Sequence, residues 1–318
     1  MLGEGAYGAV QLVRHRSTGS MYAMKILSKE ATREANAVEL TKLERDVLKR
    51  ARHPFVVQMA YAFQSPEKLF MVVDLVEGGD MYAHMQKQEK FPEGAMRVWA
   101  AEISLAVGYL HSVGVIFRDL KPENILLDMN GHCKLTDFGL AAIVEDAGDT
   151  AHSFCGTPYY VSPELITKCR VEGKDRGGYS KDVDWWALGI LCYELLVGGP
   201  PFDGSSGQEV YKKIVNLPII EVASALSKKS RASPPAIKFI TGLLERDLTK
   251  RLGGGQEDVQ SIRKHEFFKG LDWAAVENME VAPLYKPASP ADGSSKRESA
   301  DHYTRKSEQI YPAISTTI

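Results

Sequence analysis

The sequence predicts an α+β protein in which a small β-rich lobe precedes a larger, mainly helical one. Short apolar, strand-like runs alternate with turn residues through the first 73 residues. Farther along, residues 96–111 repeat apolar side chains at the helical period of about 3.6, and residues 182–197 form a strongly apolar run that suits a helix. The intervening run Asp74–Asp80 (DLVEGGD) changes the composition and suits a linker. A length of 318 residues is sufficient for two lobes.

These shifts in pattern predict four segments along the chain. We expect a small lobe at 1–73, a hinge at 74–80, a large lobe at 81–268 and a partly disordered, low-apolar tail at 269–318. Within the large lobe, residues 168–178 read as a solvated insertion, and further helices are expected from Gln208, Pro235 and about Ser261.

The composition is that of an ordinary globular protein, with 44% hydrophobic and 25% charged residues. A formal net charge of −2 argues against nucleic acid as an obligate partner. The four cysteines lack metal-binding spacing, which favours free thiols in a reducing compartment. No signal peptide and no apolar run of about 20 residues is evident. We therefore expect a monomer without a membrane span, located in the cytoplasm and also in the nucleus.

The small lobe opens on a glycine-rich stretch, Gly3-Glu-Gly5-Ala-Tyr-Gly8. The same spacing occurs in dinucleotide-binding folds, where a helix begins at the glycines. Here residues 9–13 continue as a strand, and Lys25 follows inside the next strand. We therefore reject the dinucleotide interpretation and expect the glycines to let the backbone close over phosphates, with Lys25 bonded to them.

An amphipathic helix is predicted over residues 31–51, with Leu40, Leu43, Val47 and Leu48 on one face. Glu44 lies on this helix, and taken alone it would be a solvated residue. His53-Pro54 ends the helix, and residues 55–62 and 69–73 are predicted to be strands.

Chemistry concentrates in Phe117–Asn124 (FRDLKPEN) and in Asp137-Phe-Gly139. Asp119 is suited to orient a hydroxyl and accept its proton, and Lys121 would neutralise a moving phosphoryl group. Asn124 and Asp137 supply hard oxygen ligands of the kind that Mg²⁺ prefers. A polar turn with a capping residue is the alternative, but it does not account for the whole octet together with Asp-Phe-Gly.

Two further stretches are predicted to serve the large lobe. Residues 140–164 are polar and irregular, and a loop of this kind next to a catalytic site commonly acts as a switch ordered by a phosphate that pairs with arginine. The apolar helix over 182–197 is expected to be a buried pillar, with Asp184 capping backbone amides near its start.

Seven motifs in this order resemble those of eukaryotic protein serine/threonine kinases of the AGC group. They are GEGAYGAV (3–10), AMK (23–25), FRDLKPEN (117–124), DFG (137–139), GTPYYVSPE (156–164), DVDWWALG (182–189) and KRLGGG (250–255). Residues 237–287 are most similar to the ribosomal S6 kinase and mitogen- and stress-activated kinase branches. The resemblance implies a two-lobed protein-kinase-like fold, with a small antiparallel-β lobe carrying one main helix and a large mainly α-helical lobe.

The resemblance also implies a set of site residues. Asp119 would be the catalytic base, acting with Lys121, Lys25 and Glu44, and Lys25 would pair with Glu44. Mg²⁺ would be bound by Asn124 and Asp137. The residues implied to bind ATP are Gly3, Glu4, Gly5, Gly8, Val10, Ala23, Lys25, Asp74, Val76, Asp80, Glu123 and Leu126.

The implied partners are protein substrates with arginine upstream of the accepting serine or threonine. Asp80, Glu123 and Glu194 would read that arginine through carboxylate–guanidinium contacts. An upstream kinase would phosphorylate Ser153, with Arg118 as the partner of the phosphate, and Arg251 would pair with Glu164.

The sequence departs from the family pattern in places. Phe117 replaces the usual His or Tyr, and Ala142 stands where relatives carry a Lys or Arg that helps to bind the loop phosphate. Arg118 would then carry most of that duty, which weakens the expected dependence on phosphorylation. The chain begins at the glycine loop, so we expect a truncated first strand, and Ser315 is expected to be a disordered serine.

Two other functional classes are alternatives to an active protein kinase. A pseudokinase or nucleotide-binding signalling scaffold would keep the fold without catalysis, but such proteins lose the equivalents of Lys25, Asp119 or Asp137, and all three are present. A kinase of small molecules is disfavoured by the Gly156-Thr-Pro-Tyr-Tyr160 loop and by the acidic residues suited to a basic peptide.

Overall fold

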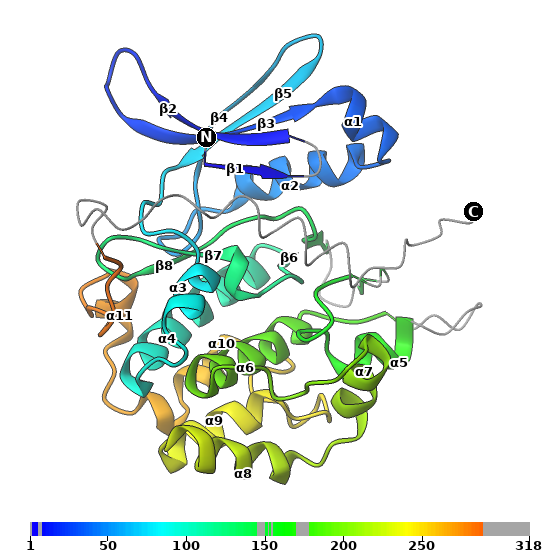
Figure 1. Cartoon of the computed structure of the whole chain (residues 1–318), viewed down its shortest axis with the longest axis vertical. Coiled ribbons are helices and arrows are strands. Elements are labelled where there is room, and N and C mark those ends of the chain that lie inside the picture. Colours follow the sequence, from blue (N-terminus) through cyan, green and yellow to red (C-terminus); the bar gives the residue numbers. More distant parts are fainter. Residues whose placement is uncertain are drawn as a thin grey trace. The chain divides into compact units, whose positions relative to one another are not determined.

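The computed structural model describes residues 2–5, 8–144, 150–151, 153, 155–169 and 178–288. The chain divides into two compact units, and Figure 1 follows the chain through both of them. Met1–Val38 and Met59–Leu75 contribute to the first unit, and Glu39–Gln58 and Val76–Pro287 form the second. The first is built on an antiparallel sheet and the second is mainly helical, which confirms the α+β class. The segment boundaries predicted from the sequence stay predictions.

A five-stranded antiparallel sheet with the order β1-β2-β3-β5-β4 forms the body of the first unit. Its strands are β1 (Gly3–Gly5), β2 (Gly8–Arg14), β3 (Met21–Ser28), β4 (Met59–Gln64) and β5 (Lys68–Asp74). The register sets Val10 opposite Lys25, and Ala23 lies two residues before Lys25 on β3. Because side chains alternate along a strand, Val10, Ala23 and Lys25 share one face of the sheet.

Glycine is required at position 8 by close packing. β1 and β2 form a hairpin in which Gly5 lies opposite Gly8, and Gly8 in turn lies opposite Leu27 of β3. A Cβ atom on Gly8 would stand 1.8 Å from the carbonyl oxygen of Ile26. No side chain fits there, so at least this glycine of the motif serves the sheet itself.

The single helix predicted over 31–51 is wrong, because the structure has α1 (Lys29–Glu34) and α2 (Val38–Arg50) with a break between them. Asn36 adopts a left-handed conformation with a φ of 52°. Its amide donates to Arg33, and the next amide donates to the carbonyl of Thr32. This pattern is a Schellman motif, which ends α1 and satisfies its last carbonyls.

The strand predicted over 55–62 is also partly wrong, because β4 begins only at Met59. The amide of Val57 donates to the carbonyl of Leu135, and the amide of Leu135 donates to the carbonyl of Phe55. The preceding residues therefore pair with β8 (Cys133–Leu135) in the second unit rather than extending the sheet. Burial of Phe55, Val56 and Val57 accounts for their apolar pattern.

The second unit is organised around α6 (Asp182–Val197), whose predicted bounds are confirmed. This helix is buried along almost its whole length and packs against α4 (Glu93–Ser112), α8 (Ile219–Ser230) and α9 (Pro234–Leu243). The other helices are α3 (Met81–Lys87), α5 (Pro163–Cys169), α7 (Gly207–Asn216), α10 (Val259–Arg263) and α11 (Trp273–Glu277), with 3-10 turns at Pro122–Asn124 and Glu266–Phe268.

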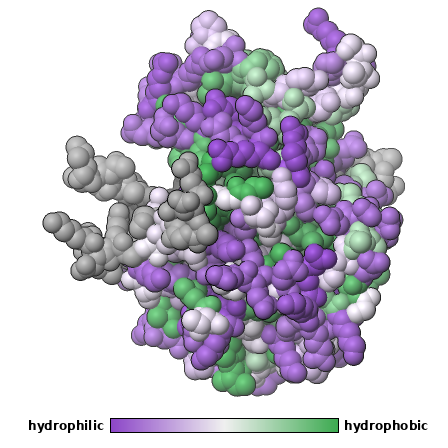
Figure 2. Space-filling view, turned by 180° about the vertical axis from the view of Figure 1, so that it is seen from behind, coloured by the Kyte–Doolittle hydropathy of each residue, from purple (hydrophilic) through white to green (hydrophobic). Residues whose placement is uncertain are grey.

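Two short two-stranded antiparallel sheets complete the second unit. β6 (Val115–Ile116) pairs with β9 (Ala142–Ile143), and β7 (Ile125–Leu127) pairs with β8. The face of the molecule in Figure 2 is mainly hydrophilic, with hydrophobic residues in small separate areas. Of the helices in the described part of the chain, none is both long and apolar enough to cross a membrane.

Candidate active site

The loop after β6 is held by a buried carboxylate on α6. Asp184 Oδ2 accepts from the amide of Phe117 at 2.8 Å, and its Oδ1 accepts from the amide of Arg118 at 2.7 Å. Asp184 does cap backbone amides, as expected, but these amides belong to the loop rather than to its own helix. Arg118 has a φ of 69°, a left-handed conformation that is costly for a side chain of this size. The two hydrogen bonds help to offset that cost.

Asp119 lies at the centre of a small polar cluster. The residue is 7% exposed, and Oδ2 lies 2.8 Å from Lys121 Nζ. The side-chain amide of Asn124 donates to the same oxygen at 2.8 Å and to the Asp119 carbonyl at 2.9 Å. A carboxylate fixed by a cation and an amide in this way can orient a hydroxyl and accept its proton. The structure thus brings Asp119, Lys121 and Asn124 together.

Asp137 lies in the loop that follows β8 and has a φ of 60°. The amide of Thr136 donates to the carbonyl of Asn124 at 3.0 Å, which ties this loop to residues 117–124, called the catalytic loop below. Phe138 is fully buried and packs edge-on against Phe117, with ring centroids 5.2 Å apart. Phe117 therefore serves packing in this site.

The donor atoms in this loop pair suit Mg²⁺. Because Asn124 uses its side-chain nitrogen for Asp119, its side-chain oxygen is the atom suited to a metal, and Asp137 adds a carboxylate. In the described part of the chain, no group of three or more His, Cys, Asp or Glu residues could hold a metal ion by itself. Two protein oxygens are what Mg²⁺ needs when waters and substrate phosphates supply its other ligands.

The predicted nucleotide-binding residues fall in both units. Gly3, Glu4, Gly5, Gly8, Val10, Ala23, Lys25 and Asp74 belong to the first unit, and Val76, Asp80, Glu123 and Leu126 belong to the second. In the second unit Asp80 and Leu126 form an antiparallel bridge, and the amide of Gly78 donates to the carbonyl of Leu127 at 2.9 Å. Asp80 Oδ1 also caps α3 by accepting from the amide of Ala83.

Lys25 and Glu44 belong to different units, so their pairing stays a prediction. Glu44 is 6% exposed on α2 and lies among the buried residues of that helix. The interpretation of Glu44 as an ordinary solvated residue is therefore wrong. A buried carboxylate is costly without a partner, and it is suited to hold a cation.

Glu123 and Glu194 form an acidic group in the second unit. Glu194 on α6 accepts a short hydrogen bond from the hydroxyl of Tyr160, and the pKa of Glu194 is raised mainly by burial and further by the charge of Glu123. Burial likewise raises the pKa of Glu123, with Asp119 and Asp80 adding to the effect. The role of Tyr160 could not be predicted from the sequence, because the motif gives no sign that its hydroxyl faces α6.

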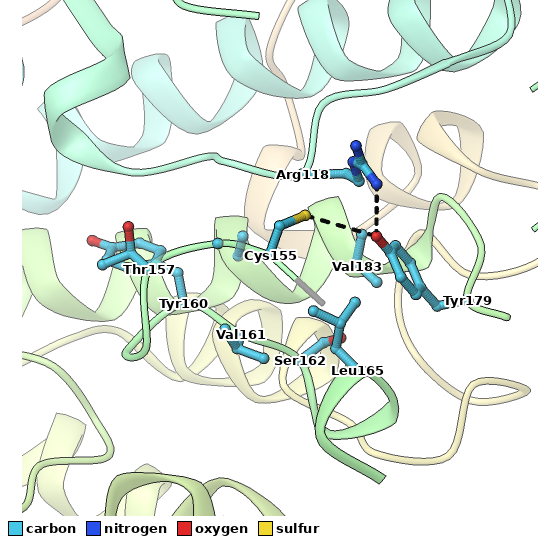
Figure 3. Close-up of a pocket in the computed structure, with 11 residues that line it drawn as sticks. Arg118, Cys155, Thr157, Tyr160, Val161, Ser162, Leu165, Tyr179 and Val183 are labelled. Atoms are coloured by element: carbon cyan, nitrogen blue, oxygen red, sulfur yellow. Dashed lines mark hydrogen bonds between the residues drawn. The ribbon is translucent and has the colours of Figure 1, made fainter. Parts of the chain in front are cut away.

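The loop that precedes α5 is linked to Arg118 through Tyr179. Figure 3 shows the Arg118 guanidinium and the Cys155 sulfur both directed at the Tyr179 hydroxyl. Arg118 Nη1 donates to this hydroxyl at 2.9 Å, and the hydroxyl donates to the Ser153 carbonyl at 2.8 Å. The side chain of Ser153 is exposed. Residues around this group line a cavity of about 20 Å³, which is about the size of one water molecule.

The predicted pair of Arg251 and Glu164 is confirmed. Arg251 donates to both oxygens of Glu164 at 2.7 and 2.8 Å, and the two residues are 3% and 6% exposed. The guanidinium also lies 5.3 Å from the ring centre of Trp186. This bidentate pair joins α5 to the segment that precedes α10.

The beginning of the tail lies on the second unit. The Tyr285 hydroxyl is 2.8 Å from His84 Nδ1, and His84 Nε2 is 2.7 Å from the carbonyl oxygen of Gly78. The Tyr285 ring also packs edge-on against Phe91 and Trp99. The tail motif around Ser315 and the insertion from 170 to 177 lie outside the described residues.

Comparison with known proteins shows the family to which the chain belongs. A family model described as "Protein kinase domain" matches residues 1–268, so the chain belongs to the protein kinase domain family. It is 44% identical over 90% of its length to the serine/threonine-protein kinase sgk-1 of Caenorhabditis elegans, of which it covers 58%. It is 39% identical over 91% of its length to the human ribosomal protein S6 kinase alpha-2, of which it covers 38%.

A third relative is the serine/threonine-protein kinase Sgk1 of rabbit (Oryctolagus cuniculus), which is 40% identical over 92% of this chain and is covered over 65% of its own length. These relatives place the chain in the AGC group of serine/threonine kinases, on the branch that holds the S6 and Sgk kinases. The chain spans about 58% of the length of the sgk-1 relative.

Proposed function

We propose that this protein transfers the γ-phosphoryl group of ATP to serine or threonine hydroxyls of protein substrates. The observation that carries the proposal is the geometry of Asp119, with Lys121 and Asn124 both 2.8 Å from its Oδ2. The serine/threonine-protein kinases named above support it, because they match over about nine-tenths of this chain.

Each residue of the loop has a distinct task in this proposal. Asp119 orients the substrate hydroxyl and accepts its proton, and Lys121 neutralises negative charge on the phosphoryl group during transfer. Asn124 fixes the rotamer of Asp119 and offers its oxygen, together with Asp137, to Mg²⁺. When bound, Mg²⁺-ATP supplies the phosphoryl group and the metal charge that stabilises it.

Residues of the first unit would hold the nucleotide. Lys25 shares a face of the sheet with Val10 and Ala23, so a cation lies beside small apolar side chains suited to an adenine ring. We propose that Lys25 binds the phosphates and pairs with the buried Glu44, and that the backbone of Asp74 and Val76 meets the adenine edge.

We further propose that the substrates carry arginine upstream of the acceptor residue. Support comes from the half-buried carboxylates of Asp80, Glu123 and Glu194, since a guanidinium can satisfy such groups through paired hydrogen bonds. Tyr160 holds the Glu194 carboxylate in place. We also propose that an upstream kinase phosphorylates Ser153. We propose a cytoplasmic and nuclear location, as predicted from the sequence, and fractionation of cells tests it.

Substitution of Glu194 by Gln tests the specificity. We expect the KM for a serine peptide with upstream arginine to rise about tenfold, because one charge-assisted hydrogen bond is lost. The KM for a matched peptide with alanine in place of arginine should stay unchanged. Glu221→Gln, on the exposed part of α8, is the control for removal of a surface charge.

The raised pKa values of Glu123 and Glu194 add a pH test to the same comparison. Protonation of either carboxylate removes its attraction for arginine. The KM for the arginine peptide should therefore rise as the pH falls from neutral towards the raised pKa values, above the ordinary 4.5 of glutamate. Equal pH profiles for the two peptides would contradict this assignment.

Transfer of labelled phosphate from Mg²⁺-ATP to a peptide library tests the function as a whole. Turnover confined to serine or threonine peptides with upstream arginine is the expected result. A pseudokinase or nucleotide-binding scaffold would instead show a melting temperature raised by Mg²⁺-ATP without turnover, in protein phosphorylated on Ser153 as well as in unphosphorylated protein.

A further inference from the structure

Protein acceptors define the position of the Arg118 side chain. Nε donates to the carbonyl of Leu140 at 2.5 Å, and Nη2 donates to the carbonyl of Ala141 at 2.8 Å. Nη1 donates to the hydroxyl of Tyr179 at 2.9 Å. All three guanidinium nitrogens are thus used, and the planar group is held from three sides.

Tyr179 is itself fixed on every side. It is 1% exposed and packs in an apolar cluster with Ile116, Val161, Leu165 and Val183, together with Ala151. Its backbone exchanges two hydrogen bonds of 3.0 Å with Ala151. Burial raises the pKa of its hydroxyl, so this group keeps its proton and can donate to the Ser153 carbonyl while it accepts from Arg118.

These contacts join three parts of the chain. Leu140 and Ala141 directly follow the Asp-Phe-Gly motif, Ser153 and Ala151 precede the Gly-Thr-Pro motif, and Arg118 adjoins Asp119. The Tyr179 hydroxyl connects Arg118 to the segment before the Gly-Thr-Pro motif, because it accepts from Arg118 and donates to the carbonyl of Ser153. Ala142, the next residue on the segment, is apolar and adds no cation to the group.

We propose that Tyr179 is a positioning residue for the phosphoryl transfer proposed above: its hydroxyl joins Arg118, which also bonds to Leu140 and Ala141, to the main chain at Ser153, and so fixes the catalytic loop before Ser153 is phosphorylated. The inference rests on the proposed kinase function. The Ser153 carbonyl is two hydrogen bonds, of 2.8 and 2.9 Å, from Arg118, so a phosphate on the same residue would give a second route to the guanidinium. The hydroxyl and the phosphate are therefore partly redundant.

The test compares wild type, Ser153→Ala, Tyr179→Phe and the double variant, all prepared without an upstream kinase and confirmed unphosphorylated by mass spectrometry. Tyr193→Phe removes a hydroxyl from an equally buried tyrosine on α6 and is the matched control. We expect wild type, Ser153→Ala and the control to share one kcat on an arginine-containing serine peptide. Tyr179→Phe should lower kcat about tenfold with the KM for ATP unchanged, because a hydrogen bond to a charged group is lost.

Phosphoserine placed at position 153 by genetic code expansion separates positioning from general stability. In the Tyr179→Phe protein it should restore most of the lost kcat, because the phosphate can engage Arg118 directly. A merely structural role would leave kcat low and the melting temperature reduced in both forms, and that result would overturn the proposal. An unchanged kcat in unphosphorylated Tyr179→Phe would overturn it as well, as would a wild type that is active only with phosphoserine.

Hydrogen–deuterium exchange keeps this inference distinct from the kinase proposal. Peptides covering residues 140–144 should exchange faster in Tyr179→Phe than in wild type or Tyr193→Phe, whether or not the protein turns over. If every protein is inactive but this difference is present, the kinase proposal fails and the structural link stands. If exchange is the same in all of them, the link itself is refuted.

Discussion

Asp184 illustrates how single residues build this site. It accepts from two successive amides of the catalytic loop, and His111 Nε2 lies 2.9 Å from the oxygen, Oδ2, that accepts from Phe117. His111 is fully buried and also contacts Asp258 at 3.1 Å. Although burial by itself would lower it, the hydrogen bonds and charges of Asp184 and Asp258 raise the pKa of His111. An imidazole held between two carboxylates thus supports the loop that carries Asp119.

His53 makes a prediction about stability at the same scale. Burial lowers its pKa from 6.5 to about 4. As the pH falls from 6.5 towards 4, the unfolded chain therefore takes up a proton that the folded chain refuses, and stability is lost. At about 1.4 kcal/mol per pKa unit, the loss amounts to about 3 kcal/mol.

His53→Asn measures this contribution by urea unfolding over the same pH range. The substitution keeps an acceptor near the amide of Phe55, which now donates to His53 Nδ1 at 3.3 Å, but it cannot take up a proton. We expect the variant to lose less unfolding free energy than wild type between neutral and acid pH. Parallel curves for the two proteins would contradict the prediction.

At the scale of elements, local chemistry decides where a helix ends, and tertiary contacts decide which of its side chains serve the site. Asn36 divides the predicted helix in two, although the charged and apolar pattern runs through it without a break. α6 is different, because its apolar run, its bounds and its burial agree. It supplies Asp184 to the catalytic loop near one end and Glu194 to the acidic group near the other.

The link between α5 and the segment before α10 predicts a large loss of stability. Glu164→Gln leaves Arg251 buried without its carboxylate, and we expect the unfolding free energy to fall by about 3–5 kcal/mol. The double variant Glu164→Leu/Arg251→Met should recover much of this loss, since apolar residues of similar size remove the stranded charge.

An exposed ion pair provides the control for that measurement. Glu39 and Lys42 lie 2.7 Å apart on α2 but are 83% and 55% exposed. Glu39→Gln should change the unfolding free energy by less than about 1 kcal/mol, as is usual at the surface. If urea unfolding gave a similar change in unfolding free energy for Glu39→Gln and Glu164→Gln, burial of the Glu164–Arg251 pair would not increase its contribution to stability.

At the scale of the whole molecule, contiguous motifs carried most of what the sequence could predict. Local sequence patterns predict the α+β class and α6. The resemblance to a known family predicts the catalytic loop and the Glu164–Arg251 pair. Tyr160, Tyr179 and His111 could not be found in this way. Each acts through a contact with a residue far away in the chain, and an isolated tyrosine or histidine gives no sign of its partner.

The break at Asn36 escaped prediction for another reason. Asn is one of the few residues that adopt the left-handed conformation readily, but the charged and apolar pattern continues on both sides of Asn36, so the pattern alone predicts one helix. The pattern of Phe55–Val57 was misleading in a similar way, because burial against β8 gives the same apolar run as a strand of the main sheet.

Asp119 is proposed as the base in phosphoryl transfer, and Asp119→Asn tests this role most directly. The amide can still meet Lys121 and Asn124 but cannot accept a proton, so kcat on an arginine-containing serine peptide should fall about 10³-fold while ATP binding is nearly unchanged. Asp203→Asn, 81% exposed, is the control and should retain full activity. Turnover of Asp119→Asn close to that of wild type would contradict the assignment of the base and the mechanism built on it.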